Sequence, residues 1–489
     1  MVFSDLLFLF LFLPLNLLLQ RLMPNIRGKN IVMLLFSLFF YTWGEPVYVL
    51  LLIATTFVNW AAALVMEKRR TVGRSAKLPL VAACVVSLGT LSIFKYGMFF
   101  CRNLQALTGL EFTIPEIALP IGISFYTFQA LSYTVDVYRG EVKAQRSFPT
   151  LLMYVSLFHQ CIAGPIVRYS HVEQEILHRS TNTADIAAGV RRFSAGLAKK
   201  ALLANPCGEL ADRILLAAAT ANDLSLAAEN LAALSGLDSL ALALGVLAWS
   251  LQIYLDFSAY SDMAIGMGLM VGFHYRENFD HPYISTSVSE FWRRWHISLG
   301  SFFRDYVYIP LGGNRCGSMR TTLNLLLTWL LTGLWHGASW NFVLWGLFFF
   351  VFLVIEKIGL LKILEKIPAF FSHIYLLIVV FFGWILFRFS DFRYIPVVIK
   401  GLFGLNRNAF IDFETRTLLI GNIIFIIVAL FSVTPIVKRL STACQNSEKG
   451  SFPSVLYKIL SIILPLVILF LSTLALVGDS YNPFLYFQF

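Results

Sequence analysis

The sequence predicts an all-α polytopic membrane protein with about 10–13 transmembrane or re-entrant helices, because a full span needs about 20 mostly apolar residues. Two observations carry this prediction. Hydrophobic residues make up 58% of the 489 positions and charged residues only 13%, whereas soluble domains carry about 25% charged residues. Apolar stretches also recur from one end to the other, and a water-soluble chain of this size could not bury so much apolar surface in one core.

Ten apolar stretches approach the length of a membrane span. They are Leu6–Leu19, Ile31–Trp43, Val47–Met66, Leu78–Phe100, Leu240–Leu255, Leu323–Trp335, Phe342–Ile355, Ile374–Phe387, Thr417–Val437 and Ile459–Val477. Helices are expected because lipid offers no other partner to backbone polar groups. The shorter stretches are expected to be re-entrant, tilted or longer than these bounds. The first is read as a retained span, since no basic segment precedes it and no small-x-small cleavage site follows.

The net charge of +10 comes from basic residues gathered in short loops. The three groups are Arg21, Arg27 and Lys29; Lys68, Arg69, Arg70, Arg74 and Lys77; and Arg168, Arg179, Arg191, Arg192, Lys199 and Lys200. The segments Thr220–Asp238 and Gly478–Phe489 contain no Lys or Arg. This positive-inside pattern predicts a multi-pass protein of the bacterial cytoplasmic (inner) membrane with cytoplasmic basic loops and both termini outside. It argues against nucleic acid as a partner and favours membrane lipids.

The chain is predicted to be one membrane domain, residues 1–489, with a core at about 119–346. Polar and aromatic residues crowd into apolar surroundings between Pro120 and Trp345, where polar groups are costly and therefore point to function. Six arginines make Tyr275–Arg320 unsuited to a simple span. Its Arg, Trp and Tyr content predicts an interfacial helix that opens at Ser289-Glu290 and ends at the turn Ile309–Asn314.

His336 is the first candidate for chemistry. It follows an apolar run and is flanked by Gly333 and Gly337, which allow close approach of another helix or a substrate. A neutral imidazole there could take a proton from a hydroxyl or thiol and return it to a leaving group. The alternative is a histidine that only hydrogen-bonds a neighbouring helix.

His296 is the second candidate, in the string Trp292-Arg293-Arg294-Trp295-His296. Arginines can pair with phosphates and tryptophans can stack on a base, and an acyl-CoA donor carries both features. The alternative is an interfacial helix that holds lipid head groups.

A third cluster directly follows an apolar run. Asp256 with Tyr260, and Ser258 with Asp262, are four residues apart and share a helix face. Carboxylates beside a span are unusual. They could orient a histidine, neutralise an arginine of the next segment or end the span at the interface; an arginine partner is favoured. No metal site is predicted here, because no histidine joins them at ligand spacing. The six cysteines form no C-x-x-C pair and receive no role.

Taken together, these strings closely resemble the membrane-bound O-acyltransferase (MBOAT) family, in its bacterial branch typified by the alginate O-acetylation membrane protein. The resembling segments are Leu119–Gln129, Tyr254–Gly266, Asn278–Leu299, Arg304–Arg315, Leu334–Gly346 and Pro483–Phe489. The resemblance implies a ring of helices around a thinned core, with two funnels that meet near the catalytic histidine. It maps that histidine to His336 in Trp335-His336-Gly337, and the second polar position to His296.

The resemblance also implies the reaction and its partners. Acetyl-CoA is the expected cytoplasmic donor, no bound cofactor is expected, and an esterase-like periplasmic or surface partner would place the acetyl group on a polysaccharide. Residues expected to bind the donor or line a funnel are Arg293, Arg294, Trp295, Arg304, Asp305, Tyr308, Asn314, Arg315, Asp256, Ser258, Tyr260 and Asn341.

Three other functions remain open at this stage. The same machine could transfer D-alanine to teichoic acid from a carrier-protein thioester, or acetylate peptidoglycan. A transporter would also place polar groups in the membrane, but it should show broken helices in two related halves, and the sequence shows none.

Overall fold

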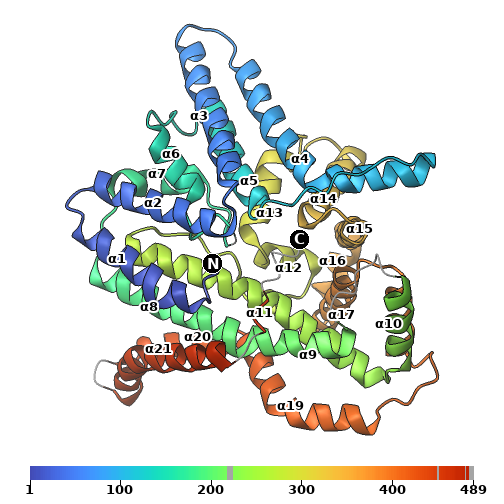
Figure 1. The fold of residues 1–489 in the computed structure, drawn as a ribbon. Coiled ribbons are helices and arrows are strands. Elements are labelled where there is room, and N and C mark those ends of the chain that lie inside the picture. Colours follow the sequence, from blue (N-terminus) through green and yellow to red (C-terminus); the bar gives the residue numbers. More distant parts are fainter. Residues whose placement is uncertain (163, 217–223, 449–450, 479–480, 484–489) are drawn as a thin grey trace. The chain divides into compact units, whose positions relative to one another are not determined.

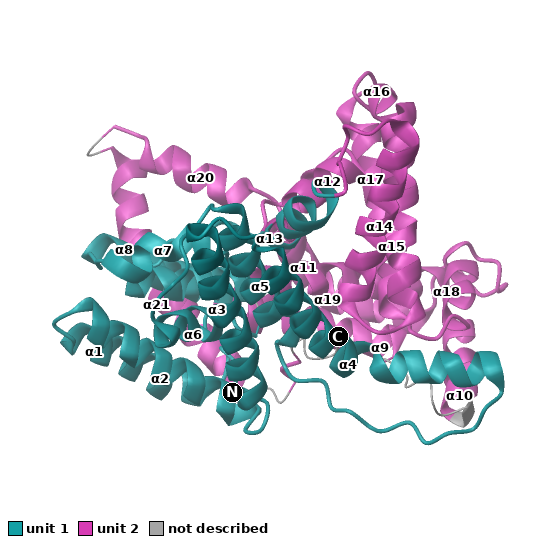
Figure 2. Ribbon diagram, turned by 90° about the horizontal axis from the view of Figure 1, so that it is seen from above, with its two compact units in different colours: residues 1–196, 260–278, 298–310 teal, residues 197–259, 279–297, 311–489 magenta. Residues whose placement is uncertain are grey.

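The computed structural model describes residues 1–489 except 163, 217–223, 449–450, 479–480 and 484–489. The described residues form helices and no strands (Figure 1), which confirms the predicted all-α class. They divide into two compact units, coloured separately in Figure 2. Each unit combines separate parts of the chain, and the expected single domain stays a prediction. Most of the closing segment Pro483–Phe489, and the start of Thr220–Asp238, lie outside the described residues.

Unit 1 contains residues 1–196, 260–278 and 298–310. Its helices are η1 (Phe8–Phe12), α1 (Leu13–Leu22), α2 (Ile26–Gly44), α3 (Val49–Thr71), α4 (Lys77–Thr108), α5 (Ile123–Arg139), α6 (Phe148–Ser156), α7 (Tyr169–His178), most of α8 (Thr183–Ala198) and η4 (Arg304–Tyr308). Buried polar side chains link three of them: Asn59 of α3 donates to Ser87 of α4 and accepts from Thr134 of α5, at 2.9 and 2.6 Å. Such interhelical hydrogen bonds stabilise helix packing in a membrane.

Unit 2 contains residues 197–259, 279–297 and 311–489. Its helices are η2 (Lys199–Ala204), α9 (Asn205–Leu215), α10 (Leu224–Gly236), η3 (Pro282–Ile284), α12 (Val288–Arg294), α14 (Ser318–His336), α15 (Trp340–Ile355), η5 (Glu356–Leu360), α16 (Leu361–Leu364), α17 (Ala369–Arg388), α18 (Tyr394–Leu402), α19 (Phe413–Ser432), α20 (Ile436–Gln445) and α21 (Phe452–Gly478). Two helices, α11 (Ser239–Val271) and α13 (Ile297–Phe303), contribute residues to both units.

Six helices of the described residues are long and apolar enough to cross a membrane: α3, α4, α11, α17, α19 and α21. Nine of the ten apolar stretches predicted from the sequence each fall mainly on one helical segment. The tenth, Thr417–Val437, is wrong as a single span, because α19 ends at Ser432 and α20 begins at Ile436. The stretch Ile31–Trp43, for example, lies within the 19-residue α2, whose N-cap Asn25 accepts from the Gly28 amide at 2.7 Å. Short apolar stretches therefore underestimate helix length, since capped polar turns extend the helices beyond their apolar parts.

The prediction of one continuous helix from Ser289-Glu290 to the turn at Ile309 is wrong. Helix α12 begins at Val288, where the Ser287 side chain accepts from the Glu290 amide at 3.1 Å, and it ends at Arg294. His296 then has a φ of 43°, in the left-handed region that a helix cannot contain. Phe291 and Trp295 are buried in the core of unit 2, so their rings contact protein and not lipid. The predicted turn after Ile309 is present.

Helices α14 and α15 approach each other closely through two glycines. A Cβ on Gly333 would lie 2.3 Å from the Phe342 carbonyl oxygen, and one on Gly346 would lie 2.5 Å from the Trp329 carbonyl oxygen. At Gly337 the nearest atoms belong to the Phe342 ring, at 2.3 Å. Of the two possible roles of Gly333 and Gly337, close approach of a helix is the one observed.

Replacing Gly333 by alanine is expected to destabilise the protein, because the new methyl group meets backbone and cannot be accommodated by a side-chain movement. Overpacking of this kind typically costs about 1–3 kcal/mol. Thermal unfolding of the purified protein in detergent should show a lower Tm. Gly421→Ala in α19 is the matched control, since nothing lies within 4 Å of its Cβ position. An equal Tm for the two variants would contradict the packing argument.

Candidate functional site

His336 is the last residue of α14, and its side chain lies in the core of unit 2, only 6% exposed. Three aromatic rings surround the imidazole edge-on: Trp335 and Trp345 with ring centroids at 5.0 Å, and Phe387 at 5.2 Å. Helices α14, α15 and α17 each contribute one of these rings. The histidine therefore faces a packed aromatic core and not the lipid.

His296 lies between α12 and α13 and is 2% exposed. Its ring packs edge-on against Phe257 at 4.6 Å and against Trp335 at 5.6 Å. Trp335 thus contacts both histidines. Burial lowers the pKa of His296 well below its usual value, and the charge of a protonated His336 lowers it further. The two imidazoles are therefore close enough for the charge on one to affect the other. With its pKa lowered, the imidazole of His296 is neutral at pH 7.

The backbone of His296 is strained. A residue other than glycine pays of order 1–3 kcal/mol to occupy a sparsely populated φ/ψ region, and such residues cluster at active sites. The chain is fixed on the N-terminal side of His296, because the Asp280 amide donates to the Arg294 carbonyl at 2.9 Å. The turn at His296 directs its ring into the core between Phe257 and Trp335.

Asn341 lies in the first turn of α15 and is 1% exposed. Its amide nitrogen donates to the Phe387 carbonyl at 3.2 Å. This bond ties the start of α15 to the end of α17, beside the Phe387 ring that contacts His336. Asn341, which was expected to line a funnel, thus holds part of the aromatic surroundings of the histidine.

The two arginines of α12 have different environments. Arg294 donates to Glu290 at 3.0 Å and to the carboxylate of Asp280 at 3.1 Å, so the structure uses its charge internally. Arg293 is exposed. Trp295 is buried and stacks on Phe291 at 5.4 Å, which leaves its faces to the protein core. Of the two arginines, only Arg293 has a side chain that is exposed to solvent.

Two other predicted residues of unit 2 lie in the turn before α14. Asn314 and Arg315 are both exposed. The side-chain oxygen of Asn314 accepts from Lys357 at 2.7 Å. A lysine, an arginine and an amide thus occur together on the surface formed by this turn and η5.

Asp256 forms an ion pair at 2.7 Å with Lys200, and both side chains are only 2% exposed. Lys200 also donates to the Pro483 carbonyl. The expected arginine partner is therefore wrong for Asp256: a lysine from η2 takes that place. Ser258, which lies on α11 with Asp256, is buried and donates to the Leu255 carbonyl at 3.4 Å.

The remaining predicted residues belong to unit 1. Asp262 does pair with an arginine, Arg192, at 2.6 Å. Tyr260 is buried and stacks on Phe3 at 5.1 Å. Tyr308 is half-buried in η4, and burial raises its pKa.

Arg304 and Asp305 form part of a charged cluster in unit 1. Asp305 accepts from Arg304 at 2.7 Å and from Arg168 at 2.8 Å. Burial alone would raise the pKa of Asp305, but these two guanidinium groups outweigh it and lower that pKa. The neighbouring Tyr306 donates to Asp136 at 2.6 Å, and its ring lies 4.9 Å from the guanidinium carbon of Arg168.

Sequence reasoning missed several residues of these sites. Lys200 was counted among loop charges, although it leads directly into the apolar run Ala201–Ala204, and that neighbourhood was an available signal. Trp345 and Phe387 had no local signal, because each is one of many aromatic residues in an apolar helix.

This chain is similar to known proteins that transfer acyl groups. The model of the family described as "MBOAT, membrane-bound O-acyltransferase family" matches residues 139–395, which include both histidines. The probable alginate O-acetylase of Azotobacter vinelandii is 36% identical over the whole of both chains. The peptidoglycan O-acetyltransferase of Helicobacter pylori is 31% identical, with 83% of this chain and 80% of that protein covered. The teichoic acid D-alanyltransferase of Bacillus subtilis is 26% identical, with 47% and 56% covered.

Proposed function

Because the chain belongs to the membrane-bound O-acyltransferase family, we propose that this enzyme transfers an acetyl group from cytoplasmic acetyl-CoA across the membrane for O-acetylation of an extracellular or cell-wall polysaccharide. The observation that supports it most directly is the pair of buried histidines, His296 and His336, which share contacts with Trp335. Three relatives named for alginate match over their full length, whereas the D-alanyltransferase of Bacillus subtilis matches only in part. This difference favours acetyl over D-alanyl.

In the proposed reaction His336 acts as general base and then as general acid. It takes the proton from the hydroxyl of the acceptor while that oxygen attacks the acetyl carbonyl carbon. The carbon–sulfur bond of the thioester breaks, and the imidazole returns the proton to the departing thiolate. His296 is held neutral by burial and positions the site through its contact with Trp335.

The acetyl group must be passed to an acceptor that is not part of this chain. We propose that an esterase-like periplasmic or surface protein receives the acetyl group on a hydroxyl and passes it to the polymer. Exposed basic residues, Arg293 and Arg315, are proposed to meet the phosphates of acetyl-CoA. With the basic loops in the cytoplasm, as the positive-inside pattern indicates, both termini lie outside.

Labelling of membrane vesicles tests donor and sidedness together. Everted vesicles, which expose the cytoplasmic face, should incorporate acetyl label from acetyl-CoA, and right-side-out vesicles should not, because the donor does not cross lipid. A D-alanyl carrier-protein thioester should give no transfer. Labelling from that thioester and not from acetyl-CoA would overturn the proposal. Acetyl analysis of separated exopolysaccharide and peptidoglycan fractions then distinguishes the two acceptors.

A further inference from the structure

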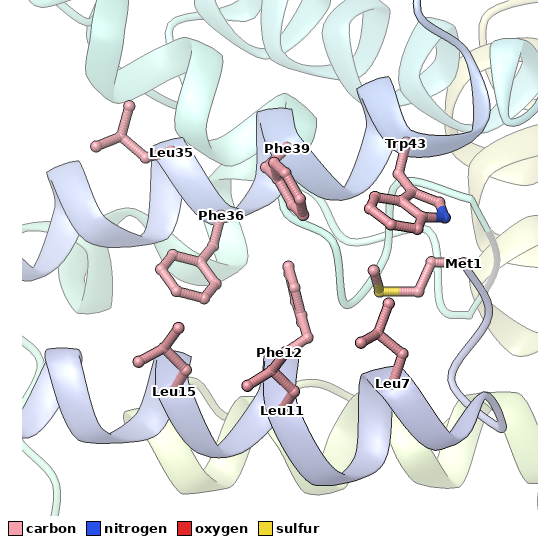
Figure 3. A pocket seen from close by; sticks show the side chains of 9 residues that line it. All are labelled: Met1, Leu7, Leu11, Phe12, Leu15, Leu35, Phe36, Phe39 and Trp43. Atoms are coloured by element: carbon pink, nitrogen blue, oxygen red, sulfur yellow. The ribbon is translucent and has the colours of Figure 1, made fainter.

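An apolar groove lies between the first two helices of unit 1 (Figure 3). Leu7, Leu11 and Leu15 from the η1–α1 helix face Leu35, Phe39 and Trp43 from α2. Both sets repeat every four residues, so each forms a stripe along one helix face. These six side chains are 41–60% exposed. The groove has a volume of about 530 Å³, which is within the range of about 300–1,000 Å³ found for small-molecule sites.

The floor of the groove is aromatic. The ring of Phe12, which is 5% exposed, lies 5.1 Å from Phe36 and stacks at 6.3 Å on Phe39. From Leu7 to Leu15 the groove extends for eight residues, about 12 Å along a helix. Half of the hydrocarbon core of a bilayer is about 15 Å thick. The dimensions therefore suit one acyl chain of a lipid in a single leaflet.

The two ends of the groove differ in charge. Arg21 lies in the last turn of α1, and Arg27 and Lys29 lie in the first turn of α2. The sequence has no acidic residue between Asp5 and Glu45. Arg21 and Arg27 are exposed. At the opposite end, Asp5 accepts from the Val2 amide at 2.6 Å and Glu45 accepts from the Ile121 amide at 3.2 Å. An anionic head group is attracted to the first end and repelled by the second.

The composition of the walls argues against a protein helix as the occupant. Helices that associate within a membrane usually meet through small residues, which let the backbones approach. The stripes of this groove consist of leucine, phenylalanine and tryptophan. Large flexible and aromatic side chains instead match the irregular surface of an acyl chain.

We propose that this groove binds one anionic phospholipid, with an acyl chain between the two stripes and the phosphate at Arg21, Arg27 and Lys29. The site is separate from the histidines of unit 2 and does not depend on the acetyl-transfer proposal. Binding of a lipid here stabilises the native α1–α2 pair, because a ligand of the folded state alone shifts the unfolding equilibrium.

Native mass spectrometry of the full chain in detergent tests the site. Phosphatidylglycerol and phosphatidylcholine with identical acyl chains are added in equal amounts, and the lipid retained on the protein is counted. The wild type should retain phosphatidylglycerol preferentially. Each basic residue near a lipid head group contributes about fivefold in affinity, so R21Q/R27Q/K29Q should lose most of that preference.

Two further variants make the result specific. K68Q/R74Q/K77Q removes the same charge from three exposed positions elsewhere in unit 1 and should leave the preference unchanged. L11W fills the groove and should reduce retention of both lipids at an unchanged membrane level. Equal retention of the two lipids by the wild type, equal losses in both triple variants, or a second polypeptide displaced by L11W would each refute the proposal.

Discussion

Replacing His336 by alanine is expected to abolish acetylation of the polysaccharide while the protein remains in the membrane at its wild-type level. Loss of a general acid–base residue typically lowers the rate by about 10²–10⁴-fold. The amount of acetate that mild base releases from the polymer should therefore fall to background. His336→Gln should be equally inactive, because glutamine fills similar space and hydrogen-bonds but exchanges no proton near pH 7.

The two variants together separate chemistry from packing. If His336 only hydrogen-bonded or packed against Trp345 and Phe387, glutamine would restore much of the activity and the alanine defect would follow the loss of Tm. His178→Ala, at an exposed position in α7, is the control for removal of a histidine and should remain active. Wild-type acetyl content in His336→Ala would exclude the catalytic role.

Breaking the buried ion pair of unit 2 is expected to have the largest effect on stability. Lys200→Met leaves the Asp256 carboxylate, which is 2% exposed, without its 2.7 Å partner. Removal of one member of a buried pair typically costs about 3–5 kcal/mol, because the remaining charge stays desolvated. Unfolding of the purified protein by denaturant in detergent should therefore show a strongly reduced free energy of unfolding.

Replacing both members tests that explanation. K200M/D256L removes both buried charges, and substitution of a whole pair by apolar residues is often neutral, so most of the lost stability should return. Arg213→Gln breaks the exposed 3.8 Å pair with Glu414 and should cost about 1 kcal/mol or less. A double variant as unstable as Lys200→Met would show that another contact of Lys200, its bond to the Pro483 carbonyl, carries the effect.

The ion pair also bears on the proposed reaction. Asp256 precedes Phe257 on α11, and the Phe257 ring packs against His296 at 4.6 Å. A shift of α11 after loss of Lys200 would move that ring. The variants of Lys200 should therefore be compared for acetylation only at temperatures below their unfolding transitions.

Local patterns predicted the helices and marked His296 and His336 as candidates, but they did not predict the path of the chain near His296. Charge and aromatic content made Tyr275–Arg320 resemble a surface helix. The structure instead ends α12 at Arg294 and buries Phe291 and Trp295. An aromatic residue that alternates with arginine can face lipid or protein, and only the neighbouring helices decide which.

From sequence alone come the all-α membrane class, the apolar helices, the basic loops and the candidate histidines. Each is readable locally, because a helix in lipid satisfies its backbone hydrogen bonds within itself and hydropathy adds residue by residue. Only the tertiary structure showed that Lys200 pairs with Asp256, that Trp335 contacts both His296 and His336, and that Gly333 lets α15 pack closely against α14. These are contacts between residues distant in sequence, and their energies depend on which side chains the packed helices bring together and remove from water.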